Sequence, residues 1–153
     1  MNHTNDATYQ GRVLTTFELY LQLAHTAYHF ANETFLRSNH ITSAKFVILK
    51  LIKLNCGKIT NSELANHTNT KRSNVSIIIK HMTEENLVTT EPDLTDRRVL
   101  IIKYTDKGRK LLEEAGSTAS YIAETLMQGI TEKQITELTK TLNLIKINLT
   151  RNR

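Results

Sequence analysis

Cysteine and proline are almost absent from this sequence, and each scarcity excludes a class of structure. Cys56 is the only cysteine, so no intramolecular disulfide can form, and we expect a reducing, cytoplasmic setting. Pro92 is the only proline, which leaves little room for a flexible linker. Residues 1–12 are polar and show no signal-peptide pattern, and no apolar run approaches the roughly 18 residues of a membrane span. The sequence therefore predicts a soluble intracellular protein.

Catalytic motifs are also missing. The sequence contains no glycine-rich phosphate loop, no pair of carboxylates in a suggestive context and no nucleophile elbow. We therefore expect neither an enzyme nor a cofactor. The 153 residues are enough to bury one core, and the net charge of +5 with a pI near 9.4 mildly favours a polyanionic partner.

The positive charge of the whole chain is not concentrated in residues 58–103. Residues 58–103 hold seven Lys and Arg against six Asp and Glu, so this segment is nearly neutral by count. An ordinary solvated surface would explain the charge alone. Basic residues nevertheless gather at two places within it, which are Lys71, Arg72 and Lys80 in one segment and Arg97 and Arg98 in another.

The first of these basic groups falls within a pair of short helices. Thr60-Asn61-Ser62-Glu63 has the form of a capping box, which predicts a helix start. A second helix is predicted from about Lys71 to Glu85, because Val75, Ile78, Ile79 and Met82 recur at helical spacing. Asn86 follows, a residue that tolerates the left-handed conformation at helix ends.

The second basic group falls in the turn of a predicted hairpin. Residues 87–91 and 99–104 read as two strands, joined by a turn over residues 92–98 that carries the arginines, and Lys58-Ile59-Thr60 can add a third strand. Two helices followed by a basic hairpin are the layout of a winged helix-turn-helix, which places one helix in the major groove of DNA and the wing along the backbone or minor groove. The sequence therefore predicts a protein that binds double-stranded DNA.

Several short segments of this region carry a family resemblance. They are Glu63-Leu64-Ala65, Val75-Ser76, Leu87-Val88, Asp96-Arg97-Arg98 and Thr105-Asp106-Lys107-Gly108. Together they resemble the pattern of the MarR family of bacterial transcription regulators, and the Asp-Arg-Arg turn shortly before Thr-x-x-Gly is the most specific part. The sequence departs from that pattern at four places: Lys71 replaces a capping serine, Met82-Thr83 replaces Leu-Glu, Asn86 replaces glycine and Tyr104 replaces leucine.

The flanking segments predict long helices. Residues 13–37 carry apolar side chains three and four apart, as do residues 106–129, and Thr131-Glu132-Lys133-Gln134 is a second capping box. The last helix has an apolar seam of Ile135, Leu138, Leu142, Ile145 and Leu149. A second copy of the chain can cover this seam. The alternative is that the first and last helices pack on each other within one chain.

The resemblance implies a specific division of the chain. The expected fold is mainly α with a small β-hairpin wing (α+β), a winged helix-turn-helix over about residues 42–108 flanked by dimerisation helices at about 11–37 and 106–150. Residues 11–153 would form one domain, preceded by a disordered or loosely ordered tail over residues 1–10. In the family the first, fifth and sixth helices form the dimer interface, so a homodimer is expected.

Helical geometry selects the side chains that face DNA. If Val75, Ile79 and Met82 point inward, the opposite face is exposed, and Ile77 either presses on a thymine methyl or packs on a wing or partner surface. In the wing, Asp96 is expected to brace the turn by pairing with Arg98, which frees Arg97 for an A·T-rich minor groove. The predicted DNA-binding residues are Lys71, Arg72, Ser73, Asn74, Ser76, Ile77, Lys80, Arg97 and Arg98.

Two other groups of residues suggest chemistry. His25 and His29 lie on one helix face, but no third ligand follows from the spacing, so no metal site is predicted and a packing or effector-pocket role is favoured. Cys56 has no adjacent cation to lower its pKa, so a half-buried structural thiol is expected. Residues predicted to line an effector pocket are Tyr20, His25, Tyr28 and Phe46.

We interpret the sequence as a homodimeric transcription regulator. The resemblance implies a repressor that binds a pseudo-palindromic operator through two recognition helices roughly 34 Å apart. A small-molecule effector would relieve repression by changing that spacing. The alternative is a winged-helix module that binds another protein and has no strong affinity for DNA.

Overall fold

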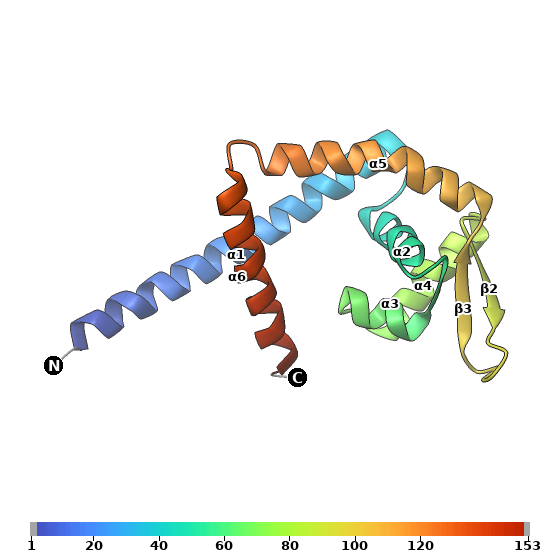
Figure 1. The fold of residues 1–153 in the computed structure, drawn as a ribbon, viewed down its shortest axis with the longest axis horizontal. Helices are drawn as coiled ribbons and strands as arrows, with labels where there is room; N and C mark the ends of the chain where they lie inside the picture. The colour runs from blue at the N-terminus through green and yellow to red at the C-terminus, as the bar shows by residue number, and fades with distance from the viewer. Residues whose placement is uncertain (1–2, 152–153) are drawn as a thin grey trace. The chain divides into compact units, whose positions relative to one another are not determined.

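The computed structural model describes residues 3–151, with side chains described from residue 8 onward. The fold is mainly helical with one small antiparallel sheet, as the sequence predicted (Figure 1). In chain order the elements are α1 (His3–Asn39), α2 (Ser43–Leu54), β1 (Lys58–Thr60), α3 (Asn61–Thr68), α4 (Arg72–Glu84), β2 (Val88–Pro92), β3 (Leu100–Tyr104), α5 (Asp106–Leu126) and α6 (Glu132–Arg151).

The chain divides into two compact units, residues 1–119 and residues 120–153. The first contains α1 to β3 and most of α5, and it holds the whole helix-turn-helix and the wing. The second contains the end of α5 and α6. The single domain expected over residues 11–153 stays a prediction.

The first helix is longer than expected. It starts at His3, whereas the sequence suggested a loose tail up to residue 10. No proline stands in this stretch to stop the helix, and polarity alone does not prevent helix formation. The apolar side chains of its first half, among them Leu14, Phe17 and Leu21, are exposed, whereas Phe35 near its end is buried.

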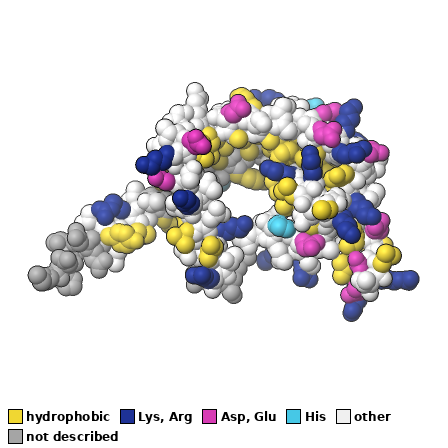
Figure 2. Space-filling view, in the orientation of Figure 1, with side chains coloured by type: hydrophobic (Ala, Val, Ile, Leu, Met, Phe, Trp, Pro, Cys, Tyr) yellow, Lys and Arg dark blue, Asp and Glu magenta, His cyan; other side chains and the backbone are white. Residues whose placement is uncertain are grey.

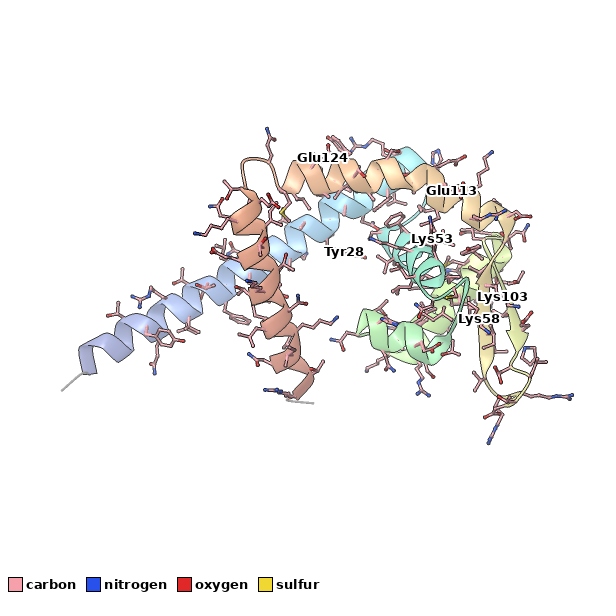
Figure 3. All side chains as sticks on the ribbon, in the orientation of Figure 1. Tyr28, Lys53, Lys58, Lys103, Glu113 and Glu124 are labelled. Atoms are coloured by element: carbon pink, nitrogen blue, oxygen red, sulfur yellow. The ribbon has the colours of Figure 1, made fainter. Side chains whose placement is uncertain are left out.

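The three strands form a sheet of order β1-β3-β2, so the short β1 does pair with the return strand of the hairpin. Lys58 lies opposite Lys103 in this register (Figure 3), which sets two positive charges side by side. Glu91 offsets this repulsion, because its carboxylate forms an ion pair with Lys103.

Both capping boxes form as the sequence predicted. The Thr60 hydroxyl accepts from the Glu63 backbone N–H at 3.2 Å, and the Glu63 carboxylate accepts from the Thr60 N–H at 2.8 Å. The bonds that the Glu63 carboxylate accepts from the Thr60 N–H and the Thr60 hydroxyl hold the pKa of Glu63 below its usual value. Thr131 and Gln134 repeat the arrangement at the start of α6. Both helices therefore start where the sequence says.

The junction between the sheet and α5 explains the Thr-x-x-Gly motif. The Thr105 hydroxyl donates to the Asn86 carbonyl at 2.7 Å and accepts from the Gly108 N–H at 3.0 Å. A Cβ atom on Gly108 would stand 2.0 Å from the Leu87 carbonyl oxygen, so only glycine fits. Asn86 itself has φ of +57°, the left-handed conformation expected after the second helix. These contacts fix the end of α4 against the start of α5.

The core of the first unit gathers side chains from every element around the sheet. The largest fully buried ones are Leu49 and Ile52 of α2, Ile59 of β1, Leu64 of α3, Val75 and Met82 of α4, Val88 of β2 and Ile102 of β3. Burial of this kind sets the angle of α4 against the hairpin, because each side chain occupies a volume that no other conformation fills as well. Within residues 3–151, no helix combines the length and the apolar character needed to cross a membrane.

Candidate nucleic-acid interface

The recognition helix α4 follows α3 after a turn of three residues. Asn69 ends α3 in the left-handed conformation, and Lys71 then occupies the N-cap position of α4 with extended backbone. The Lys71 side chain makes no capping hydrogen bond, because a lysine has no acceptor to offer. The predicted start at about Lys71 is thus off by one residue, and the helix begins without the support that serine or threonine gives.

The two faces of α4 separate as helical spacing predicted. Val75, Ile79 and Met82 are buried against the core, whereas the opposite side is open to solvent. Ile77 is 57% exposed, so it packs on nothing within the first unit. The exposed residues of this face and its N-cap are Lys71, Arg72, Ser73, Asn74, Ser76, Ile77 and Lys80, all predicted to contact DNA.

One of these residues also holds α3 and α4 together. The Asn61 amide donates to the Ser76 hydroxyl oxygen at 2.6 Å, and the Ser76 hydroxyl donates to the Arg72 carbonyl at 2.9 Å. The hydroxyl hydrogen of Ser76 is therefore used within the protein. The sequence placed Asn61 in a capping box but did not predict this contact, because only the packing of α3 on α4 brings Asn61 to Ser76.

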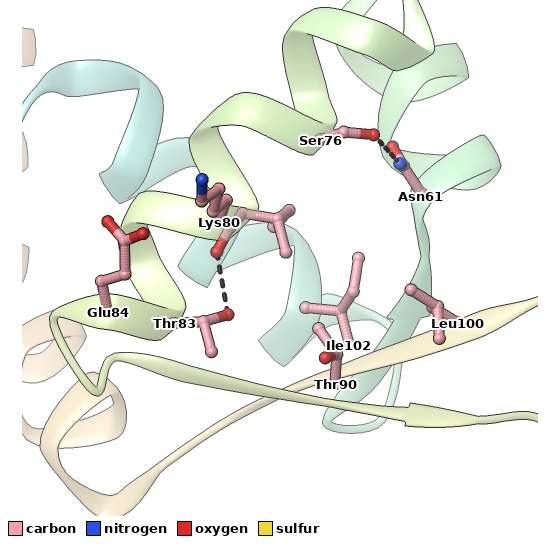
Figure 4. A pocket seen from close by; sticks show the side chains of 9 residues that line it. Asn61, Ser76, Lys80, Thr83, Glu84, Thr90, Leu100 and Ile102 are labelled. Atoms are coloured by element: carbon pink, nitrogen blue, oxygen red, sulfur yellow. Dashed lines mark hydrogen bonds between the residues drawn. The ribbon is translucent and has the colours of Figure 1, made fainter.

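A groove of about 320 Å³ separates α4 from the wing sheet (Figure 4). Ser76, Lys80 and Glu84 line it from α4, and Thr90 and Leu100 line it from the strands. Leu100 is half exposed at the wing side of this groove. The recognition helix and the wing thus stand as two separate ridges with a hollow between them.

The tip of the wing is organised by Asp93. Its carboxylate accepts from the backbone N–H of Thr95 at 2.8 Å and of Asp96 at 3.1 Å, and from the Thr95 hydroxyl. These bonds lower the pKa of Asp93, with the Thr95 hydroxyl the largest cause. Sequence reasoning did not single out Asp93, although Asp-x-Thr at a turn is a recognisable signal for such local bonds.

The expected ion pair between Asp96 and Arg98 is present. Asp96 Oδ1 accepts from the Arg98 backbone N–H at 3.0 Å and from Arg98 Nε at 3.1 Å. Arg97, between them, is exposed. The turn therefore directs one arginine back onto its own loop and leaves the other free.

A second, polar pocket brings the two basic groups together. About 250 Å³ in volume, it lies beside the start of α3 and is lined by Thr60, Asn61, Ser62, Arg72, Arg98, Val99 and Leu100. Arg72 comes from the recognition helix and Arg98 from the wing, 26 positions apart in the sequence. Arg97 does not line it.

Ion pairs show which basic side chains of this region are neutralised by an acid and which are not. Glu85 pairs with Lys45 at 2.5 Å, Glu91 pairs with Lys103, and Asp96 pairs with Arg98. In the described part of the chain, by contrast, Lys71, Arg72, Lys80 and Arg97 have no acidic partner within 4.0 Å. On the face shown in Figure 2, Lys and Arg side chains are interspersed with acids. Of the predicted interface cations, Arg98 alone is held in an ion pair among the described residues.

The residues expected to line an effector pocket are not all in one place. Tyr28 lines a cavity of about 260 Å³ among α1, α2, α3 and α4, together with residues that were not predicted to line a pocket, such as Ala44 and Val75. Phe46 is instead buried with its ring stacked on Phe35, 4.6 Å between centroids. Tyr20 and His25 are exposed on α1 and do not line the cavity.

The histidine pair and the cysteine also have defined positions. His25 and His29 are exposed, with their Nε2 atoms 3.2 Å apart, and no cluster of three metal-ligating side chains occurs among the described residues. Cys56 is exposed rather than half-buried, because it lies in the left-handed turn that follows α2, with φ of +56°.

Comparison with known proteins matches this sequence to transcription regulators. Residues 41–100 match the model of the MarR family. The chain is 26% identical over 130 residues to the HTH-type transcriptional repressor IacR of Pseudomonas putida, covering 85% of this chain and 77% of that protein.

Two solved structures show that the fold is shared. Sco3205, a MarR family transcriptional regulator of Streptomyces coelicolor solved in complex with DNA, has a TM-score of 0.82 at 17% identity and covers 89% of this chain and 86% of its own. The organohalide-sensing RdhR-CbdbA1625 regulator, solved in its 2,4-dichlorophenol-bound form, has a TM-score of 0.76 at 22% identity and covers 97% and 85%.

Proposed function

Because this chain belongs to the MarR family of DNA-binding transcriptional regulators, we propose that it is a homodimeric repressor of a pseudo-palindromic operator, acting in the cytoplasm. The observation that carries the DNA-binding geometry is the convergence of Arg72 and Arg98 on one polar pocket. Repression fits the printed function of IacR, which is a transcriptional repressor.

The exposed face of α4 is proposed to read the major groove. Arginine can hydrogen-bond guanine with two donors, asparagine can do the same with adenine, and an exposed isoleucine can contact a thymine methyl. Arg72, Asn74 and Ile77 supply these three chemistries on one side of the helix. Lys71 and Lys80 add positive charge at the two ends of that side.

The polar pocket is proposed to receive a backbone phosphate. Arg98 lines it from the wing, and its guanidinium can bind phosphate oxygens with charge-assisted hydrogen bonds, while Arg72 at the same pocket is left to reach a base. A phosphate held there would set the register of α4 on the duplex, since backbone contacts position a protein without reading sequence. Arg97, free of an acidic partner, would enter an adjacent A·T-rich minor groove.

The second copy is proposed to bind through α1, α5 and α6. None of the described residues of α6 is buried, although its seam from Ile135 to Leu149 is apolar. Exposed apolar surface of this extent is typical of an interface. A two-fold dimer presents two recognition helices one DNA turn, roughly 34 Å, apart, and its two-fold symmetry demands an inverted repeat.

A small-molecule effector is proposed to bind the cavity lined by Tyr28. RdhR-CbdbA1625, a protein of the same fold, is a sensing regulator solved with 2,4-dichlorophenol bound. The cavity contacts α4 through Val75 and Ile78, so its occupant would bias the orientation of the recognition helix.

The experiment is a salt titration of the DNA that co-purifies with the protein. Binding by Lys and Arg to several phosphates should weaken steeply with salt, with a log–log slope near −0.9 per phosphate contacted. Arg97→Ala should weaken binding to all sequences and reduce the slope by about one, whereas Arg72→Ala should relax preference at one base position by about 1–3 kcal/mol.

Lys133→Ala, which removes a charge from the first turn of α6, is the matched control and should change neither quantity. Equal losses on specific and random DNA for Arg72→Ala would exclude direct base reading by that side chain. Absence of DNA binding at low salt would instead favour a winged-helix module that binds another protein.

A further inference from the structure

The cavity among α1, α2, α3 and α4 has an almost entirely apolar wall. Six of its lining residues are aliphatic, and they come from three different helices: Ala31, Ala44, Val47, Ile48, Val75 and Ile78. No lysine, arginine, histidine or carboxylate lines it. Its polar atoms, apart from the backbone, are the hydroxyls of Tyr28, Ser43, Thr68 and Thr70.

Three of these four hydroxyls already donate a hydrogen bond within the protein. Ser43 Oγ donates to Asn32 Oδ1 at 3.2 Å, which also accepts the Ser43 backbone N–H. Thr68 Oγ1 donates to the Leu64 carbonyl at 2.7 Å, and Thr70 Oγ1 donates to the Thr68 carbonyl at 3.2 Å. What these groups still present is oxygen lone pairs, which accept hydrogen bonds and repel negative charge.

Backbone donors around the cavity are also engaged. The Thr70 N–H donates to the Ala65 carbonyl at 2.9 Å, and the Val75 N–H donates to the Lys71 carbonyl at 3.2 Å. Among the side chains described here, the Tyr28 hydroxyl is the one lining donor without a partner. Tyr28, labelled in Figure 3, is more than half exposed, so this donor stands at the cavity's edge.

We propose that this cavity binds an uncharged, mainly apolar molecule and rejects carboxylates. The inference rests on the proposed role of the cavity as the effector site and adds the class of ligand. A carboxylate inside it would lose its hydration and meet aliphatic groups and lone pairs, with neither a cation nor a set of donors to replace the water. A neutral ligand meets no such penalty, and a single hydroxyl or N–H on it can donate to the free lone pairs.

The volume sets the size of the ligand. An apolar cavity of about 150 Å³ is enough to bind benzene. At about 260 Å³ this one has room for a bicyclic aromatic ring. Such a ligand would touch α1 and α2 on one side and both α4 and the turn before it on the other, which is how its binding would reach the recognition helix.

The test compares two naphthalenes that carry their substituent at the same ring position, 2-naphthol, which is neutral at neutral pH, and 2-naphthoate, which is an anion. The chain contains no tryptophan, so either probe can be excited beyond the absorption of tyrosine and followed by its own fluorescence. We expect saturable binding of 2-naphthol, with an affinity at least about tenfold higher than that of 2-naphthoate at neutral pH. Equal or tighter binding of 2-naphthoate, or no binding of 2-naphthol up to its solubility limit, would overturn the inference.

Substitutions assign the binding to this cavity. Ala31→Phe fills it from α1, and Val47→Phe, at a half-exposed position on its rim, fills it with less risk to folding. Each should lower the affinity for 2-naphthol by about tenfold or more. Ala24→Phe adds the same bulk two turns earlier on α1, outside the cavity, and should leave the affinity unchanged. Unchanged binding in both filled variants would place the ligand elsewhere and contradict the inference.

Release of DNA is measured separately, by titrating 2-naphthol into the protein–operator complex. Binding of 2-naphthol that leaves DNA affinity unchanged would refute the effector role while supporting the ligand class. If 2-naphthol binds and releases DNA, and Val47→Phe abolishes both effects, the result supports the effector role and the ligand class together.

Discussion

Lys71 is the residue at which helix stability and DNA affinity oppose each other. It stands at the N-cap of α4 without a capping bond. Lys71→Ser would supply an acceptor for the first free N–H groups and should raise the free energy of unfolding by about 1 kcal/mol. The same change removes a charge that has no acidic partner, so it should weaken DNA binding. Denaturant unfolding and DNA titration measure the two effects.

Lys80→Ser is the control for this prediction, because it removes the same charge from the same helix at a position that cannot cap it. It should weaken DNA binding without raising stability. A Lys71→Ser protein no more stable than Lys80→Ser would mean that the start of α4 does not depend on capping.

Asp96 carries a negative charge, yet we expect it to strengthen binding to DNA. Its carboxylate fixes the Arg98 backbone and guanidinium. Without it, ordering the loop on DNA would cost about 1–2 kcal/mol per residue fixed. That exceeds the relief of one screened repulsion, worth about 1 kcal/mol or less. Asp96→Ala should therefore bind the operator more weakly while the protein stays folded.

Glu91→Ala is the comparison on the same hairpin, and it should bind DNA more tightly because it removes a negative charge without disturbing the turn. It removes an equal charge from β2 but breaks only the ion pair with Lys103, away from the tip. Tighter binding by both variants, titrated at one salt concentration, would show that Asp96 acts simply as a nearby negative charge.

Local side-chain bonds of the wing were predictable from the sequence only in part. Asp96 and Arg98 are two positions apart in a tight turn, so their pairing follows from local geometry. The bond from Asn61 to Ser76 spans 15 positions and depends on how α3 packs on α4. The convergence of Arg72 and Arg98 depends in the same way on the register of the sheet, which no local pattern encodes.

Helix α6 carries an apolar seam but has no buried residue among those described. Replacing Leu142 by Asp would place an unpaired charge in the seam, at a cost of about 3–5 kcal/mol if a second copy covers it. Leu142→Asp should therefore shift the protein from dimer to monomer in analytical ultracentrifugation at micromolar concentration.

Leu144→Asp provides the comparison, since Leu144 lies on the same helix but off the seam and is exposed. It should remain dimeric. A wild-type protein that is monomeric at every concentration tested would remove the dimer and the operator geometry together.

Element boundaries followed the sequence most closely where a cap specifies them. Thr60 with Glu63, and Thr131 with Gln134, fix the starts of α3 and α6 by bonds that are written into four consecutive residues. The start of α1 has no such signal, and the apolar side chains of its first half, such as Leu14 and Phe17, are exposed. Its extension to His3 could not be read from periodicity alone.

The whole molecule combines a well-defined winged module with helices whose apolar faces are open. In the module, the ion pairs leave four basic side chains unpaired at the recognition helix and the wing, so its small net charge does not oppose DNA binding. Outside it, we propose that a second copy covers the exposed apolar seam of α6. A dimer built in this way would bind an operator with two winged modules, and a monomer would bind it more weakly with one.

Selection of DNA from a random pool by the purified protein is the most direct test of this conclusion. The bound fraction, sequenced after several rounds, should contain an inverted repeat whose half-sites lie one helical turn apart, about 10 base pairs from centre to centre. A pool without an enriched motif, or a motif without two-fold symmetry, would contradict a dimeric sequence-specific regulator.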